Sequence, residues 1–92
     1  MLKLFPTAKF RRDYKRCKRR GLDMQLLETV LDTLQREEPL DAKYHDHQLS
    51  GKYNKFRECH IQPDRLLIYH VDGDALVLTA SRTGTHSDLL DM

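Results

Sequence analysis

The stretch RECHIQPDRLLIYHVDGDALVLTASR, residues 57–82, decides the fold because two turn signals separate three strand-like segments in it. The first segment, YNKFRECHI at 53–61, alternates in polarity, with Arg57, Cys59 and Ile61 on one face and Phe56, Glu58 and His60 on the other. Pro63-Asp64 marks a turn, and RLLIYHV at 65–71 is a nearly continuous apolar run that is typical of a central strand. Asp72-Gly73 then predicts a hairpin leading into ALVLTASR at 75–82. The pattern predicts three consecutive strands.

Upstream of these strands, two segments have helical periodicity. After a short first strand at LKLFP, residues 2–6, Thr7 is a plausible N-cap for a helix that runs to about Arg20 and is followed by Gly21. The apolar stripe of this helix consists of Phe10, Tyr14 and Cys17. Asp23 can cap a second helix that ends near Glu37 or Glu38, before Pro39. The core-facing residues of the second helix are Leu26, Leu27, Val30, Leu31 and Leu34.

The order of these elements predicts an α+β fold, with an N-terminal helical hairpin packed on a small, mostly antiparallel sheet. The 92 residues suit a single domain, 1–92. Residues 39–52, PLDAKYHDHQLSGK, follow neither period, so we expect a loop that folds over the face carrying Glu58 and His60. THSDLLDM, residues 85–92, is expected to form a short terminal helix or a tail.

Charge is distributed unevenly along the chain. Residues 1–20 hold nine basic residues and one acidic residue, whereas the other seventy-two hold seven basic and thirteen acidic residues. This asymmetry favours a polyanion or an acidic protein as partner. The chain has no secretory h-region and no apolar run near the roughly 20 residues of a membrane span. Two cysteines, Cys17 and Cys59, suit reduced thiols in the cytosol.

The polar residues near the expected strand ends suit metal-free RNA cleavage. That reaction needs a base for the 2′-hydroxyl, an acid for the departing 5′-oxygen and a cation for the phosphoryl oxygens. Histidine suits the two proton transfers because the pKa of a free imidazole is roughly 6.5, and the arginine fork matches phosphate oxygens. Arg82 precedes His86 across the flexible Gly84, so both side chains can converge on one phosphate.

Plainer interpretations of the same residues stay open. His47 can be a solvated loop residue, His60 an ordinary strand residue and Asp64 a turn residue. Arg82 can simply pair with Asp88 or with a carboxylate at the chain end. The His45-x-His47 pair also permits a zinc site with His60 or His86 as third ligand, although the chain has no HExxH motif and no cysteine pair at zinc-site spacing.

Three motifs taken in order resemble one family. YHDHQLSGKYNKFRECHIQPDRLLIYHV, residues 44–71, followed by RTGTHSDLL, residues 82–90, resembles the YafQ-type toxins of the RelE superfamily, which are bacterial mRNA interferases of type II toxin–antitoxin modules. The motifs are DH-x-L-x-G, R-[DE]-x-H-[IV]-x-P-D and RTGTH. The positions that the resemblance associates with cleavage are His47, Glu58, His60, Asp64, Arg82 and His86. Relatives often have an aromatic residue in the C-terminal tail, and this chain has Leu89, Leu90, Asp91 and Met92 there.

The resemblance implies a cytoplasmic bacterial toxin that cuts mRNA, not DNA, in the ribosomal A site without a cofactor or metal, and that a cognate antitoxin silences. We expect His86 to be the general acid, His60 or His47 the base, Glu58 and Asp64 the residues that orient them, and Arg82 the phosphate ligand. The helix cations are expected to bind RNA phosphates; they are Lys9, Arg11, Arg12, Lys15, Arg16, Lys18, Arg19 and Arg20. Two alternatives are a non-catalytic module of the same fold that blocks gyrase or the ribosome, and a plain RNA-binding or antitoxin-like protein that uses only the basic helix.

Overall fold

The computed structural model describes residues 1–90, which form a five-stranded sheet, two α-helices and two 3₁₀ turns. The elements are β1 (Lys3–Pro6), α1 (Ala8–Arg19), α2 (Met24–Gln35), η1 (Ala42–Tyr44), β2 (His47–Gln48), η2 (Gly51–Tyr53), β3 (Arg57–Gln62), β4 (Arg65–Asp72) and β5 (Val77–Gly84). None of the described helices has the length and apolarity of a membrane span.

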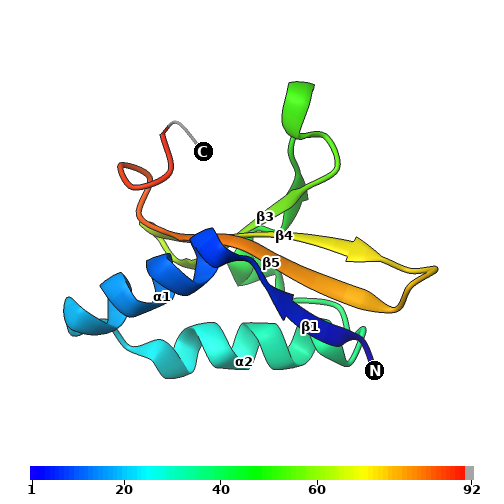
Figure 1. Cartoon of the computed structure of the whole chain (residues 1–92), viewed down its shortest axis with the longest axis horizontal. Helices are drawn as coiled ribbons and strands as arrows, with labels where there is room; N and C mark the ends of the chain where they lie inside the picture. The colour runs from blue at the N-terminus through cyan, green and yellow to red at the C-terminus, as the bar shows by residue number, and fades with distance from the viewer. Residues whose placement is uncertain (91–92) are drawn as a thin grey trace.

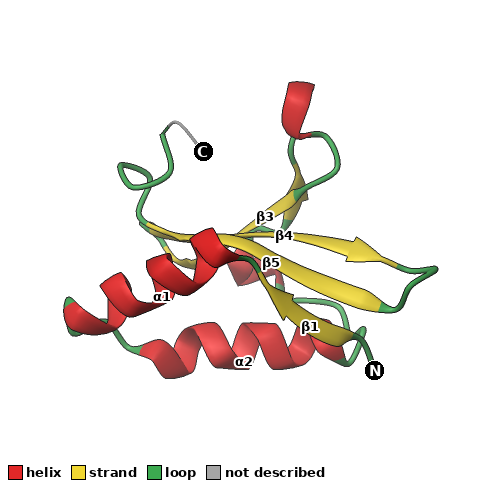
Figure 2. Ribbon diagram, in the orientation of Figure 1, coloured by secondary structure: helices red, strands yellow, loops and turns green. Residues whose placement is uncertain are grey.

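The sheet has the strand order β1-β5-β4-β3-β2, with β1 parallel to β5 and the other pairs antiparallel. Both α-helices lie on one side of the sheet, and the chain around η2 and the C-terminal segment rise from the other (Figures 1 and 2). The predicted α+β fold, a helical hairpin on a mostly antiparallel sheet, is confirmed.

Local signals set the helix boundaries. The Thr7 hydroxyl accepts the Phe10 N–H at 3.0 Å at the start of α1, and the Asp23 carboxylate accepts the Gln25 N–H at 3.0 Å at the start of α2. The second helix ends at Gln35, earlier than expected. Glu37 follows the helix in the left-handed region, with a φ of 60°. The last carbonyls of the helix accept hydrogen bonds there, that of Leu34 from the Glu37 N–H and that of Thr33 from the Glu38 N–H.

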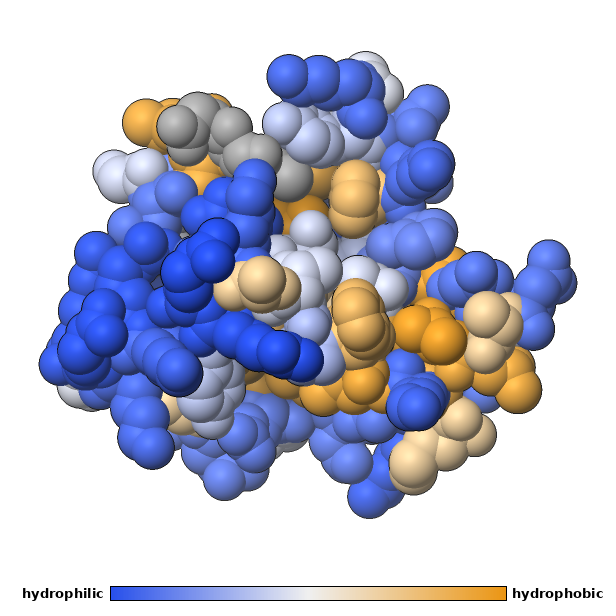
Figure 3. All heavy atoms as spheres, viewed as in Figure 1, coloured by the Kyte–Doolittle hydropathy of each residue, from blue (hydrophilic) through white to orange (hydrophobic). Residues whose placement is uncertain are grey.

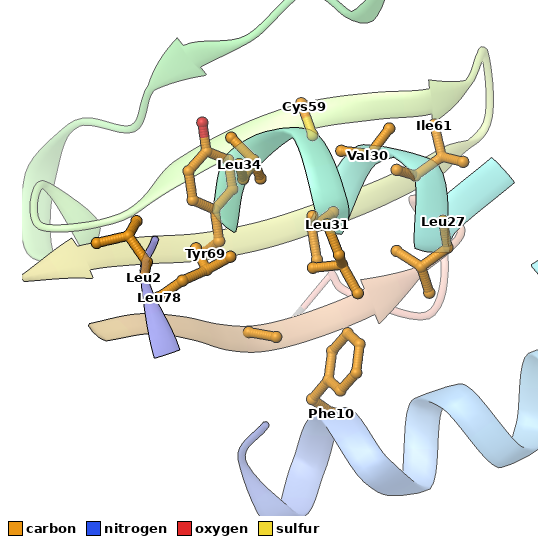
Figure 4. Close-up of a cluster of buried hydrophobic side chains, with 12 residues drawn as sticks. Leu2, Phe10, Leu27, Val30, Leu31, Leu34, Cys59, Ile61, Tyr69 and Leu78 are labelled. Atoms are coloured by element: carbon orange, nitrogen blue, oxygen red, sulfur yellow. The ribbon is translucent and has the colours of Figure 1, made fainter. Parts of the chain in front are cut away.

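The main core lies between the helices and the sheet (Figure 4). Its buried residues are Leu2, Phe10, Leu27, Val30, Leu31, Leu34, Cys59, Ile61, Leu67, Tyr69, Leu78 and Ala80. Cys59 and Ile61 belong to this core as the alternation predicts, and burial raises the pKa of the Cys59 thiol to about 12. Cys59 and Ile61 of β3 thus pack the sheet against the helices, which leaves Glu58 and His60 on the other face.

The opposite face carries a smaller apolar cluster of Leu66, Ile68 and Leu89, with Leu49 and Phe56 packed against it. The expected loop at 39–52 contains two 3₁₀ turns and the two-residue strand β2, which pairs with β3. The strand expected at 53–61 begins only at Arg57, since Gly51–Tyr53 form η2. Residues 86–90 form turns rather than a helix, and the last two residues of the expected terminal helix or tail lie outside the described residues.

Candidate active site

Four imidazoles gather on the sheet face opposite the helices, around His60 of β3. The ring centroid of His60 lies 5.7 Å from that of His45, 6.3 Å from that of His47 and 5.8 Å from that of His86. These rings come from three separate segments: the chain before β2 with the start of β2, the middle of β3, and the turn after β5. The structure therefore brings His47, His60 and His86 together, while the expected convergence of Arg82 with His86 on one phosphate stays a prediction.

Glu58 lies between two of these rings. In the sheet register it pairs with His47, and its Oε1 lies 3.4 Å from His47 Nε2 and 3.7 Å from His60 Nε2. Its side chain is only 18% exposed, so a charge on either neighbouring imidazole interacts with the carboxylate in a partly desolvated setting. Glu58 can therefore stabilise a proton on either ring.

Asp64 holds His86, the imidazole that follows β5. Its Oδ1 lies 2.6 Å from His86 Nδ1 and accepts the His86 backbone N–H at 3.1 Å. The hydrogen bonds from His86 lower the pKa of Asp64, so Asp64 is ionised at neutral pH and the Nδ1 atom carries the proton. This tautomer makes Nε2 the atom through which a neutral His86 accepts a proton and a charged His86 donates one.

Asp46 anchors the segment that carries His45 and His47. Its carboxylate accepts the Tyr69 hydroxyl at 2.5 Å and the Arg57 guanidinium at 3.1 Å. Burial, followed by the hydrogen bond to Asp46, raises the pKa of Tyr69, so the phenol stays a donor. Asp46 thus ties the chain between His45 and His47 to strands β3 and β4.

Arg82 is held by a buried carboxylate of α1. Its Nε and Nη2 donate to Asp13 at 2.7 and 3.2 Å, and Asp13 also accepts the Thr83 N–H at 3.1 Å and Arg16 Nη2 at 2.9 Å. Asp13 is 2% exposed, and these donors compensate its charge. The register aligns Arg82 with Ile68 and Glu58 across the sheet, so Arg82 lies two register positions from the row that contains His60 and Gly84. Its role as phosphate ligand stays a prediction.

Asp88 organises the turn that carries His86. It accepts the Thr85 N–H at 3.0 Å and the Arg20 guanidinium at 2.8 Å, and Thr85 Oγ1 accepts the Asp88 N–H at 3.2 Å. The hydrogen bond from Arg20 is the main cause that lowers the pKa of Asp88 to about 2. The basic C-cap residue of α1 therefore stabilises the segment on which His86 lies.

The cations of α1 form a hydrophilic surface at the left of Figure 3. A groove of about 470 Å³ on this surface is lined by Lys9, Arg12, Asp13, Lys15, Arg16, Arg19 and Arg82. Arg16 and Arg20 differ from the other expected phosphate ligands because they already contact Asp13 and Asp88. The groove connects the basic helix to the end of β5.

The sequence assigns no role to Asp13 or Asp46, and it offers Asp88 only as a plain ion-pair partner of Arg82; in the structure Arg82 pairs with Asp13, and Asp88 pairs with Arg20. Asp46 belongs to the DH-x-L-x-G motif and Asp88 to the stretch RTGTHSDLL, whereas Asp13 lies in neither. Within residues 1–90, no group of three or more histidine, cysteine, aspartate or glutamate side chains is arranged to hold a metal ion.

Comparison with known proteins identifies the family of this chain. The family model described as "Bacterial toxin of type II toxin-antitoxin system, YafQ" matches residues 2–91. The Escherichia coli K12 protein named mRNA interferase toxin YafQ is 34% identical over 84 residues, which cover 90% of this chain and 89% of that protein.

Solved structures give the same result. A metal-bound toxin from Helicobacter pylori is 42% identical with a TM-score of 0.91, over 97% of this chain and 99% of that one. The E. coli DinJ-YafQ toxin-antitoxin complex contains a chain that is 32% identical with a TM-score of 0.86, over 96% of both chains. The protein described here therefore belongs to the YafQ family of bacterial toxins of type II toxin–antitoxin systems.

Proposed function

We propose that this toxin is a ribosome-dependent, metal-independent endoribonuclease that cleaves mRNA by attack of a 2′-hydroxyl on the adjacent phosphorus. The observation that carries the proposal is the 5.8 Å separation between the His60 and His86 rings, each with its own carboxylate, Glu58 or Asp64. Two imidazoles at this distance can serve the two sides of one phosphodiester. The relative named mRNA interferase toxin YafQ supports the same chemistry.

In the proposed reaction, His60 or His47 takes the proton from the 2′-hydroxyl, and Glu58 stabilises the resulting imidazolium. The O2′–P bond forms and the P–O5′ bond breaks, which leaves a 2′,3′-cyclic phosphate. His86 in its charged form gives a proton to the departing O5′, while Asp64 orients its ring. Arg82, placed by Asp13, contributes positive charge near the phosphoryl oxygens.

The proposed substrate is mRNA in the 30S A site of a translating ribosome in the bacterial cytoplasm. The cations along α1 suit contacts with RNA phosphates, whose binding is electrostatic and independent of sequence. The proposed protein partner is a cognate antitoxin, by analogy with the DinJ partner of E. coli YafQ.

The test compares His86→Ala with His70→Ala by primer extension on translated mRNA. His70 contacts the Lys55 carbonyl and the Phe56 ring and has no place in the proposed reaction, so its variant controls for the loss of an imidazole. We expect His86→Ala to slow cleavage by about 10²–10⁴-fold and to keep its fold, because a positioned acid contributes that much. Equal cleavage rates in the two folded variants would contradict the role of His86.

Two further measurements in that assay test the chemistry. Deoxyribose on the 5′ side of the scissile phosphate should stop cleavage, because the nucleophile is gone. Toxin that is treated with EDTA and desalted before it is added to the ribosomes, which themselves need Mg²⁺, should cleave at the unchanged rate, since side chains supply the base, the acid and the cation. A slower rate that returns when a metal is added back to the toxin would instead indicate that a metal takes part, and the metal-bound H. pylori relative makes this control necessary.

A further inference from the structure

A pocket of about 720 Å³ adjoins the four imidazoles and has no role in the reaction above. We call it the η1 pocket; it is lined by Leu26, Lys43, Tyr44, His45, His60, Ile61, Gln62 and Pro63. His45 and His60 belong both to this pocket and to the imidazole cluster. A group in the pocket therefore lies against His60, which is also a candidate base of the proposed reaction.

The chemistry of the lining suits a flat, partly polar group. Leu26, Ile61 and Pro63 supply apolar surface, and Tyr44 supplies an aromatic ring with the Lys43 ammonium 5.2 Å from its centroid. Nucleobases stack on such rings and form hydrogen bonds along their edges. The volume lies within the roughly 300–1,000 Å³ of small-molecule sites.

One polar group of the pocket, the side-chain amide of Gln62, is held in place by a buried arginine. Gln62 Oε1 accepts Arg65 Nη1 at 3.1 Å, and the same Nη1 donates to the Asp23 carbonyl at 2.9 Å. Arg65 is only 6% exposed, so it holds the amide oxygen and makes the amide NH₂ the donor that Gln62 can offer a ligand.

The backbone conformation of His45, which lines the pocket, supports a functional interpretation of the pocket. His45 ends η1 in the left-handed region, with a φ of 48°, which is uncommon for a residue with a side chain. This conformation turns the chain from η1 toward β2 and places the ring against His60. Strained backbone of this kind is found preferentially at ligand-contacting positions.

The occupant follows from the position of the pocket. In the described residues β2 pairs only with Arg57 and Glu58 of β3. The same edge of β3 beyond Glu58 is therefore not covered by β2 and lies next to η1. That edge also admits a peptide strand. However, the two shared imidazoles and the Lys43 ammonium favour the substrate of the reaction, an RNA.

We propose that the η1 pocket binds the nucleobase of one of the two nucleotides that flank the scissile phosphate, with Tyr44 stacking on the base and Gln62 contacting its edge. This inference rests on the proposed ribonuclease function and extends it to the choice of cleavage site.

The experiment compares Tyr44→Leu with Tyr53→Leu on synthetic mRNAs in the A site of reconstituted ribosome complexes. Tyr53 is a matched control, since Lys52 lies over its ring at the same 5.2 Å in η2 and neither residue lines the pocket. We expect Tyr44→Leu to lower kcat/KM about 5- to 150-fold, the range for one base–aromatic stack, whereas Tyr44→Phe and Tyr53→Leu stay within about twofold of the wild type.

An abasic nucleotide separates a lost stack from a damaged fold. The mRNAs carry an abasic site either 5′ or 3′ of the scissile phosphate. At one of these two positions the abasic site should lower kcat/KM of the wild type about as much as Tyr44→Leu does on intact mRNA. On that abasic mRNA the wild type and Tyr44→Leu should then cleave at the same rate. An equal loss for Tyr44→Leu on intact and abasic mRNA overturns the proposal. Normal cleavage with weakened binding of the cognate antitoxin also overturns it and assigns the pocket to a peptide.

Dissociation constants for the same complexes are measured in parallel. A wild type that binds these mRNAs without cutting them contradicts the ribonuclease function alone, because the effect of the abasic site on binding still tests the pocket.

Discussion

Asp88 shows how single side-chain contacts position the reactive groups. It is one of three carboxylates that hold a candidate catalytic segment: Asp88 for His86, Asp13 for Arg82, and Asp46 for His45 and His47. Each accepts hydrogen bonds from a guanidinium and from at least one other donor. Asp13 is buried, and Asp88 and Asp46 are partly shielded from water, so removing one of these acceptors leaves a cation or an N–H without its partner, which is costly.

Asp88→Asn tests this idea through the dependence of stability on pH. Since Arg20 depresses the pKa of Asp88 to about 2, below its ordinary 3.8, the carboxylate contributes stability that is fully present above about pH 4 and is lost as pH falls through 2. We expect Asp88→Asn to lower the free energy of unfolding by about 1–3 kcal/mol at pH 7. The difference from the wild type should shrink toward pH 2 in urea denaturation.

Asp32→Asn is the matched control, because the Asp32–Arg36 pair has a similar length of 3.2 Å but both side chains are more than half exposed. Its effect should stay below about 1 kcal/mol. A difference between Asp88→Asn and the wild type that does not change with pH contradicts the assignment.

At the scale of elements, the junction between β5 and the terminal turn depends on Gly84. Its φ is 151°, and an added Cβ would lie 2.9 Å from Asp88 Oδ2 and 3.0 Å from Asp88 Cβ. A shift of Asp88 would disturb the hydrogen bonds that its carboxylate accepts from Arg20 and Thr85. A glycine is therefore required where the strand gives way to the segment with His86.

Gly84→Ala should lower stability by about 1–3 kcal/mol, from backbone strain and the close contact, and should also reduce cleavage by displacing His86. Gly21→Ala is the control, because Gly21 also has a positive φ, 78°, but no atom within 4 Å of the added Cβ. It should lose about 1–2 kcal/mol and keep wild-type cleavage. Thermal unfolding and primer extension measure both quantities, and wild-type cleavage by Gly84→Ala would show that the close contact does not position His86.

At the scale of the whole molecule, the basic helix lies beside the end of β5 that carries Arg82. The groove between them suits a polyanion that continues from the reacting phosphate along α1. Arg16 and Arg20 stabilise Asp13 and Asp88 as well, so they are poor choices for a test of RNA binding. Arg12 and Lys15 line the groove and are exposed, which makes them suitable.

The double variant Arg12→Gln/Lys15→Gln should weaken RNA binding and reduce the slope of log K against log salt by about 0.7 for each lost phosphate contact. Lys52→Gln/Lys55→Gln removes the same charge outside this groove and should change the slope little. Filter binding to RNA at several KCl concentrations measures both slopes. Equal slopes for the two double variants would mean that the α1 groove does not bind phosphates.

Local sequence patterns predicted most of the elements. The polarity alternation of 57–61 predicted that Cys59 and Ile61 lie in the core. The capping side chains of Thr7 and Asp23 marked where the two helices begin, and the flexible backbone of Gly21 marked where the first one ends. The exceptions were segments without a period: η1, β2 and η2 within 39–53, and the end of α2, where Glu37 adopts a conformation that glycine usually takes.

The sequence by itself determined the α+β layering, the basic helix and, through its three motifs, which histidines to consider, because caps, turns and periodicity act over a few residues. Only the tertiary structure decided that Asp13 holds Arg82, that Asp46 holds the chain around His47, that Asp88 and Arg20 hold the turn with His86, and that His45 joins the cluster. Asp13 and Arg82, for example, are 69 residues apart in the chain. Such pairs depend on how α1 packs on β5, and no local pattern encodes which buried carboxylate meets which guanidinium.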